Sequence, residues 1–370
     1  MHALVVCHDA GGTIPPVIAL VEALVSQGHE ITVLAQPSVR RRAEVAGATF
    51  RAFSALGDYD HSRTFEQQVD LIGAAIVGRG VGDDLLAIPA DVVIVDANLA
   101  GALAAAETLD VPTAVLLHSM WATYTDVWFS DLWPLLGGPV NDTRAAFGVD
   151  AVDGWPGVFL GHDRLVSAVP SVFDAPSTTS EPATLRHAGF LVPRTSASDA
   201  VRFPDGDGPA VLVSLGTTSQ GQADRLADAV DVLSAMSVRA VVTTAGQGGG
   251  AASTANVVVT EYAPHVALLP FTDVVVAHGG LGTIAAALDA GVPLVCMPFD
   301  RDQPLNASRL EALGAGRTVD GDLRAAIEQV LDDSSFRTAA VSIGDASRAA
   351  GGAAGVARDL ETLAGATRQR

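Results

Sequence analysis

The sequence predicts an α/β fold of two domains, each built on an open, mostly parallel sheet, and three observations support this. The chain has 370 residues, and domains of roughly 150–200 residues make two domains the natural division. Hydrophobic residues make up 49% and charged residues only 17%, so the chain can bury a large core. Apolar runs alternate with helical periodicity in both halves, which is typical of a doubly wound sheet.

The elements of the first half are predicted from short apolar runs separated by segments with helical spacing. Gly28 stops the first of these helices. The expected strands are Ala3–Cys7, Glu30–Ala35, Val92–Val95 and Thr113–Leu117, and the expected helices are Pro16–Gln27 and Leu99–Leu109.

Residues 189–209 interrupt this order with Pro193, Pro204 and Pro209 among Ser, Asp and Gly, which indicates an interdomain linker. We therefore expect an N-terminal domain over residues 1–195, a linker over 196–208 and a C-terminal domain over 209–352. A helix at about 353–370 could pack back on the first domain. In the second half, the expected strands are Ala210–Ser214, Arg239–Thr243, Val257–Val259, Val274–Ala277 and Leu294–Met297, and the expected helices are Gln222–Met236 and Ile284–Ala290.

The charge balance limits the partners that the chain can have. The net charge is −20 and every basic residue is arginine, which argues against nucleic acid or an anionic membrane as a partner. An anionic ligand must then be held by local features such as helix N-termini. Cys7 and Cys296 are expected to be buried and reduced. Without an apolar stretch of about 20 residues or a signal peptide, we expect a cytoplasmic protein with no membrane span.

The strongest functional signal is the run His278–Thr283, HGGLGT, between an expected strand and an expected helix. Gly279, Gly280 and Gly282 let the backbone turn tightly and approach a ligand. The start of the helix offers free N–H groups and a positive dipole end. His278 adds a donor, cationic if protonated, and Thr283 adds a hydroxyl. These groups suit a diphosphate, although glycines chosen only for strand–helix packing are an alternative.

The same run also matches the dinucleotide fingerprint G-x-G-x-x-A, with Asp300 in the place of the ribose-binding acid. The residues that follow favour a different ligand. A Gly-Val-Pro turn at 291–293 leads into a strand, and then comes DQPLNA over residues 302–307. Asp302 and Gln303 offer both donors and acceptors, which suit sugar hydroxyls. A nucleotide-sugar site is therefore favoured over a dehydrogenase site.

This combination resembles the C-terminal signature of the GT-B glycosyltransferases of natural-product tailoring, which use UDP- or dTDP-sugars and include antibiotic-tailoring enzymes of actinomycetes. Tyr262-Ala263-Pro264-His265 resembles the segment that holds the nucleotide base in that family, with His265 replacing the usual glutamine. The turn after Ser214 resembles the glycine turn near the phosphates, and adds Gly216 and Thr217. The resemblance implies two Rossmann-like domains facing each other across a cleft.

The N-terminal half resembles the family more weakly and departs from it at one position. Many members carry a histidine after the glycine of the first turn and use it as general base, but here Gly12 is followed by Thr13. A threonine cannot act as a base near neutral pH. Thr13 is therefore kept in the candidate catalytic site only for its position. For acid–base chemistry we favour Asp96, acting directly or through water. His118 and Asp9 are further candidates, and His8 is a weaker one. Each could also be an ordinary hydrogen-bonded loop residue.

Aromatic residues gather in the segment that follows His118. Such a patch can line a pocket for a flat hydrophobic acceptor. Packing on the core, or a dimer contact, is an equal alternative. The patch consists of Trp121, Tyr124, Trp128, Phe129 and Trp133.

These features together predict an inverting glycosyltransferase that moves a hexose or deoxyhexose from a dTDP- or UDP-sugar to a small, flat aromatic acceptor. No metal or cofactor is expected, because the helix N-terminus and His278 supply the electrophile. The chain is expected to be a monomer or homodimer. Two alternatives stay open, namely a nucleotide-sugar epimerase on the same fold and a catalytically silent protein that binds the donor.

Overall fold

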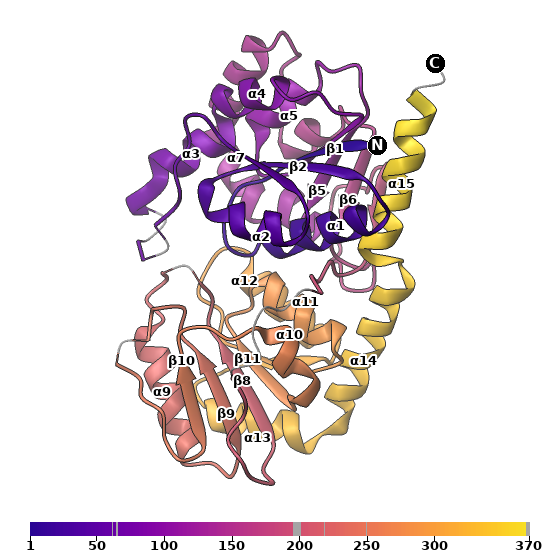
Figure 1. The fold of residues 1–370 in the computed structure, drawn as a ribbon. Helices are drawn as coiled ribbons and strands as arrows, with labels where there is room; N and C mark the ends of the chain where they lie inside the picture. Colours follow the sequence, from indigo (N-terminus) through magenta and orange to yellow (C-terminus); the bar gives the residue numbers. More distant parts are fainter. Residues whose placement is uncertain (61, 64–65, 195–200, 218, 249, 368–370) are drawn as a thin grey trace. The chain divides into compact units, whose positions relative to one another are not determined.

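The computed structural model describes residues 1–370 except 61, 64–65, 195–200, 218, 249 and 368–370, and it describes residues 66, 128 and 367 without their side chains (Figure 1). The described chain forms two compact units. The first comprises most of residues 1–193 together with Ser347–Arg370, and the second comprises Arg194–Ala346. Residues 196–200 of the expected linker lie outside the described part. Both units are of the α/β class.

The first unit is built on a seven-stranded sheet of order β3-β2-β1-β4-β5-β6-β7. All neighbours are parallel, and β1 pairs with β4 so that Ala3 lies opposite Val92. The expected strands of this half are confirmed, with bounds that differ by one residue at some ends. The strands are β1 (His2–Val6), β2 (Glu30–Ala35), β3 (Thr49–Ala52), β4 (Val92–Asp96), β5 (Thr113–Leu117), β6 (Arg164–Ser167) and β7 (Leu185–His187).

Helices cover both faces of this sheet. Pro15 and Pro16 occupy the first turn of α1, where a missing N–H costs nothing. The helices are α1 (Ile14–Ser26), α2 (Arg40–Val45), α3 (Val69–Val77), α4 (Arg79–Leu86), α5 (Ala100–Ala106), α6 (Trp121–Thr125), α7 (Trp128–Ala146), α8 (Trp155–Phe159) and α15 (Gly352–Thr367), with short 3₁₀ turns at Pro37–Val39 and Glu66–Gln68.

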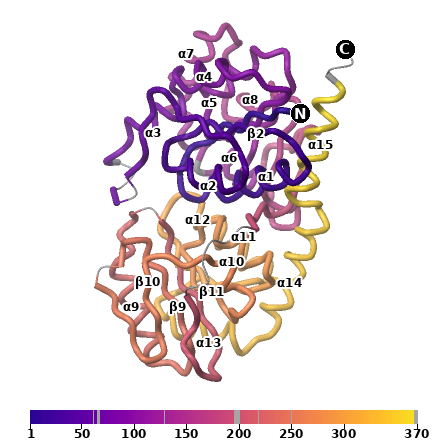
Figure 2. The backbone as a smooth tube through the Cα atoms, in the orientation of Figure 1, coloured from indigo at the N-terminus to yellow at the C-terminus, as the bar shows by residue number. Residues whose placement is uncertain are grey.

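Alternate residues of the strands feed two apolar clusters, one on each face of the sheet. Ala3 and Val5 point to the face covered by α1 and α15, and Leu4 and Val6 point to the face covered by α5. The C-terminal helix α15 lies beside α1 (Figure 2), although more than 300 residues separate them in the chain. It buries its apolar side in the same cluster as β1, so the chain ends within the first unit.

The second unit contains a six-stranded parallel sheet of order β10-β9-β8-β11-β12-β13. Its strands are β8 (Ala210–Ser214), β9 (Arg239–Thr243), β10 (Val257–Thr260), β11 (Val274–Ala277), β12 (Leu294–Cys296) and β13 (Gly316–Thr318). Its helices are α9 (Ala223–Ser234), α10 (His265–Leu268), α11 (Leu281–Asp289), α12 (Gln303–Ala312), α13 (Leu323–Asp332) and α14 (Ser334–Ala349), whose last residues belong to the first unit, with a 3₁₀ turn at Leu269–Phe271.

The order of the strands reverses at one point in each sheet, between β1 and β4 and between β8 and β11. Loops that leave the carboxyl ends of such a strand pair diverge and open a crevice. The loop after β1 carries His8 and β4 ends on Asp96, and the loops after β8 and β11 carry Gly216 and His278. Each sheet therefore places its candidate residues at its own reversal point. Within the described ranges, no helix is long and apolar enough to cross a membrane.

Candidate active site

Asp96 lies at the end of β4 and accepts hydrogen bonds from two histidines. Its Oδ2 is 3.1 Å from Nδ1 of His8, and its Oδ1 is 2.8 Å from Nε2 of His118. All three residues are buried. The backbone N–H of Asn98 donates to the same Oδ1 at 2.8 Å. The sheet brings together Asp96, at the end of β4, and two histidines from the loops after β1 and β5.

The charge on Asp96 determines where the protons of the two rings lie. Burial by itself raises the pKa of this carboxyl, but the charges and hydrogen bonds of His118 and His8 outweigh it and leave the pKa below its usual value. An ionised carboxylate only accepts hydrogen bonds. The ring protons therefore sit on Nδ1 of His8 and on Nε2 of His118. A carboxyl of lowered pKa takes up protons poorly, so these contacts favour one of the rings over Asp96 as the direct base.

The two histidines differ in the surroundings of the ring nitrogen that does not bind Asp96. Nδ1 of His118 is fully enclosed and has no hydrogen-bond partner among the described residues, whereas Nε2 of His8 is not enclosed in this way. A reacting group can reach only a nitrogen that is open on one side. His8, which the sequence marks as a weaker candidate, is therefore the ring suited to proton transfer.

Thr13 and Asp9 stabilise the loop that carries His8. The hydroxyl of Thr13 donates to the backbone carbonyl of His8 at 2.7 Å and accepts from the N–H of Ala10 at 3.2 Å. Asp9 is buried and binds the guanidinium of Arg42 at 2.7 Å. Their polar groups are engaged within the protein, which assigns them to loop structure. This differs from the catalytic roles considered from the sequence.

Two further residues near His8, Tyr59 and Gln36, are not indicated by any sequence motif. Tyr59 meets the His8 ring edge-on, with centroids 6.1 Å apart. Burial first, and the charge of Asp96 second, raise the pKa of Tyr59, so its hydroxyl stays protonated. Gln36 is buried and its Oε1 accepts from the backbone N–H of Asp9 at 3.0 Å. Only their contacts with His8 and Asp9 in the fold reveal these two residues, because they belong to no sequence motif.

The second unit contains the glycine turns, and they meet at one imidazole ring. A Cβ atom at Gly280 would lie 2.3 Å from Nε2 of His278, and one at Gly216 would lie 3.0 Å from the same atom. The backbone at Gly279 has φ +85°, and a Cβ there would approach the carbonyl oxygen of Gln303 to 2.9 Å. Each glycine is therefore needed for space or for its backbone conformation.

The histidines of the second unit are held neutral. Burial lowers the pKa of His278 and lowers the pKa of His265 to about 4. His278 can therefore donate or accept a hydrogen bond at neutral pH, but it does not supply the positive charge considered for it. The nearest partner of His265 is the hydroxyl of Thr243, 3.4 Å from Nε2.

Asn306 joins the two halves of the donor motif, and we did not single it out from the sequence. Its Nδ2 donates to the carbonyl of Gly279 and to Oδ2 of Asp302, each at 3.0 Å. The side chain of Gln303 is buried, accepts from the N–H of Phe299 at 2.9 Å and donates to Gln220 at 2.8 Å. Gln303 therefore holds the loop before α12 in this arrangement, whereas we expected it to bind sugar hydroxyls. Asp302 is partly exposed at the N-cap position before α12.

The remaining donor candidates lie around the start of α11 and after β10. Gly282 and Thr283 are in the first turn of α11, for which Gly280 is the N-cap. Tyr262 is 73% exposed and Ala263 is buried behind it. Thr217 follows the left-handed Gly216, whose φ is +92°. An open helix N-terminus and an exposed aromatic ring are features that can bind phosphate and a base.

The aromatic patch of the first unit divides into core and pocket. Trp121 and Phe129 are buried and pack against Phe159 and Trp155 in the apolar core, which corrects their expected place in an acceptor pocket. Tyr124 and Trp133 line a pocket of about 330 Å³. The side chain of Trp128 lies outside the described part of the structure.

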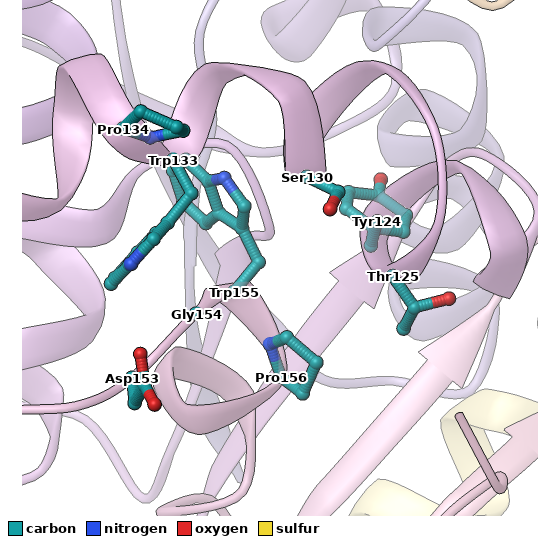
Figure 3. Close-up of a pocket in the computed structure, with 9 residues that line it drawn as sticks. All are labelled: Tyr124, Thr125, Ser130, Trp133, Pro134, Asp153, Gly154, Trp155 and Pro156. Carbon is teal, nitrogen blue, oxygen red and sulfur yellow. The ribbon is translucent and has the colours of Figure 1, made fainter. Parts of the chain in front are cut away.

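Figure 3 shows the indole rings of Trp133 and Trp155 beside each other at one end of this pocket and Tyr124 at the other. The pocket is lined by residues of α6, α7, the loop before α8 and the start of α8, namely Tyr124, Thr125, Ser130, Trp133, Pro134, Asp153, Gly154, Trp155 and Pro156.

Comparison with known proteins identifies the class of enzyme. Residues 227–363 match the family model described as erythromycin biosynthesis protein CIII-like, C-terminal domain. The 4'-demethylrebeccamycin synthase of Lentzea aerocolonigenes is 28% identical over 413 aligned residues, covering 93% of this chain and 95% of that protein. The crystal structure of the kitacinnamycin glycotransferase superposes with a TM-score of 0.81 at 24% identity, over 98% of both chains. The chain is a glycosyltransferase of the GT-B fold.

This glycosyltransferase is of the antibiotic-tailoring type. It is also similar to glycosyltransferase VinC, solved in complex with dTDP, with a TM-score of 0.73 and 22% identity over 98% of this chain and 99% of that one. The glycosyltransferase has two candidate centres, the histidines around Asp96 in the first unit and the glycine–histidine turn in the second.

Proposed function

We propose that this glycosyltransferase transfers a hexose or deoxyhexose from a dTDP- or UDP-sugar to a small, flat aromatic acceptor, with inversion at the anomeric carbon and without a metal or cofactor. The observation that carries the proposal is the contact between His8 and Asp96, 3.1 Å from Nδ1 to Oδ2. It provides a base for the acceptor hydroxyl, although position 13 is a threonine.

In this proposal, His8 is the general base. Its Nδ1–H is bound to Asp96, so Nε2 carries the lone pair that accepts the acceptor's proton. The imidazolium formed in that step is stabilised by the Asp96 carboxylate. The deprotonated oxygen attacks the anomeric carbon, and the bond to the diphosphate breaks on the opposite face. The silent-protein alternative rested on the lack of a base at Thr13, and His8 removes that reason for it.

The turn at His278–Thr283 binds the leaving diphosphate. The N–H of Thr283 bonds to the carbonyl of Gly280 at 3.2 Å, but the N–H groups of Leu281 and Gly282 precede the first intrahelical bond, and the helix dipole favours an anion there. The neutral His278 adds a hydrogen bond, and Asp302 contacts the sugar hydroxyls. This site uses fixed dipoles to stabilise the charge that develops in the transition state. The dTDP in the VinC structure supports thymidine diphosphate as the leaving group.

The pocket between Tyr124 and Trp133 accommodates the aromatic acceptor. Its volume of about 330 Å³ is at the lower end of the sizes typical of small-molecule pockets. Indole and phenol rings on its walls suit the faces of a flat ring system, because offset and edge-to-face contacts add to the burial of apolar surface.

Binding and product analysis test the proposal. A titration with dTDP, UDP and GDP should raise the melting temperature with dTDP or UDP but not with GDP, because ligands that bind only the folded state stabilise it. Incubation with a dTDP- or UDP-sugar and a set of flat phenols should give a product whose mass increases by one sugar. The configuration of the product by NMR tests inversion, and added EDTA should leave the rate unchanged. If no nucleoside diphosphate shifts the melting temperature at millimolar concentration, the donor site is assigned wrongly.

A further inference from the structure

Asp96 holds one histidine more than a base and its partner require. His118 approaches Oδ1 to 2.8 Å, closer than His8 approaches Oδ2. Both rings and the carboxyl are buried, so these bonds are shielded from water. Hydrogen bonds to a charged group in such surroundings are strong and directional.

The ring of His118 is held at a cost that packing does not explain. Its Nε2 donates to Asp96, while its Nδ1 is buried without a hydrogen-bond partner among the described residues. A buried polar nitrogen without a partner destabilises the fold. A residue of that kind is a candidate for a functional role.

Resting on the proposed role of His8, we propose that His118 is a positioning residue that holds the Asp96 carboxylate in the plane that His8 needs. Together with the N–H of Asn98, His118 engages Oδ1 and leaves Oδ2 directed at His8. It also draws part of the negative charge of Asp96 away from His8. Without His118, the whole charge of Asp96 acts on His8.

The other ionisable groups around this cluster do not compete for that role. Burial first, and Asp96 second, raise the pKa of Tyr59 and of Cys7, so both are neutral at physiological pH. Asp9 is paired with Arg42 at 2.7 Å. The Asp96 carboxylate is thus the anion in direct contact with His8, and its other direct partner ring is His118.

The experiment compares two variants of the full-length enzyme, His118→Leu and His118→Gln, in pH profiles of kcat for sugar transfer. Leucine removes the donor, so Asp96 rotates and interacts with His8 alone. We expect kcat at the optimum to fall at least about tenfold, and the acid side of the profile to move up by about half a pH unit or more. Glutamine can place an N–H near the position of Nε2, so the His118→Gln profile should lie between those of leucine and wild type.

Ser119→Ala is the matched control. Ser119 is the residue after His118, and the substitution removes a buried hydrogen bond to Thr123 without changing the contacts of Asp96. Its pH profile should equal that of wild type. Urea unfolding of each variant separates loss of fold from loss of positioning. An unshifted acid side in His118→Leu, or equal profiles for leucine and glutamine, overturns the proposal. If His8→Ala retains transfer, the proposed base itself is wrong. If His8→Ala is inactive and His118→Leu behaves as wild type, only the role of His118 fails.

Discussion

The histidines of the two units show how surroundings decide what one residue type can do. In the first unit, His8 and His118 both donate to the ionised carboxylate of Asp96. In the second unit, burial without such a partner lowers the pKa of His278 and His265 and keeps them neutral. A ring bound to a carboxylate can accept a proton and keep it, whereas a desolvated ring resists charging.

This difference matches the chemistry proposed for each unit. The acceptor hydroxyl must lose a proton, which requires a base whose charged form is stabilised. The leaving diphosphate is already anionic, and a neutral hydrogen-bond donor beside helix N–H groups can bind it without taking up a proton. The contrast predicts that variants in the two units impair different steps.

The largest expected effect is that of His8→Ala on transfer. We expect kcat to fall by about 10²–10⁴-fold, the range typical of a lost general base. The affinity for dTDP or UDP, measured by calorimetric titration, should not change, because the donor-site residues are untouched. Asp96→Asn should lower kcat as well, since an amide cannot compensate the charge of the imidazolium.

His2→Gln is the control for this variant. His2 is the first residue of β1, the strand before the loop that carries His8, and its Nε2 lies 2.8 Å from the hydroxyl of Thr32. The His2→Gln enzyme should transfer sugar at the wild-type rate. A His8→Ala enzyme that keeps its kcat while Asp96→Asn loses it would restore Asp96 as the direct base.

A smaller effect is expected from Gly280→Ala on nucleotide binding. The backbone there has φ −66° and ψ 134°, which alanine adopts freely, but the added Cβ would displace the His278 ring. We expect nucleoside diphosphate affinity to fall about 10- to 100-fold, equal to roughly 1.4–2.8 kcal/mol. Gly73→Ala, where an added Cβ meets nothing within 4 Å, is the control.

A double-mutant cycle sharpens this test. If alanine at position 280 acts through the ring, Gly280→Ala should cost little further affinity in a His278→Ala background. Equal losses in both backgrounds would show that the glycine contacts the ligand directly.

The smallest expected effect is on the pH dependence of stability. Burial lowers the pKa of His265 from 6.5 to about 4. Between these two pH values, the unfolded chain binds a proton at this residue and the folded chain does not. Stability is lost as pH falls from about 6.5 towards 4, and the loss for this group reaches about 2 kcal/mol at about pH 5. Urea unfolding of wild type and His265→Gln at several pH values measures it, and the glutamine curve should be flatter.

The effect of His265 is the difference between the free energies of unfolding of wild type and His265→Gln at each pH. A difference is needed because burial also lowers the pKa of His162, in the first unit, to about 4. That group contributes equally to both proteins and cancels. Parallel curves for wild type and His265→Gln would mean that His265 is not desolvated, and the contrast between the two units would weaken.

The fold was largely predictable because its central strands are continuous apolar runs. Strands such as Val92–Asp96 and Ala210–Ser214 are buried along their whole length and were found from the sequence. Short strands such as Thr49–Ala52 and Gly316–Thr318 lie at or beside the edges of their sheets and are mostly not fully buried, so they carry little apolar signal. They were missed for that reason.

The sequence by itself determined the donor motif, because HGGLGT and DQPLNA are contiguous runs whose glycines and polar groups have a local physical purpose. Only the tertiary structure brought together the proposed catalytic cluster. His8, Asp96 and His118 are far apart in the chain and meet because β1, β4 and β5 are neighbours in the sheet. Whether a threonine, a carboxylate or an imidazole can take a proton depends on distances and burial, which no local pattern of residues encodes.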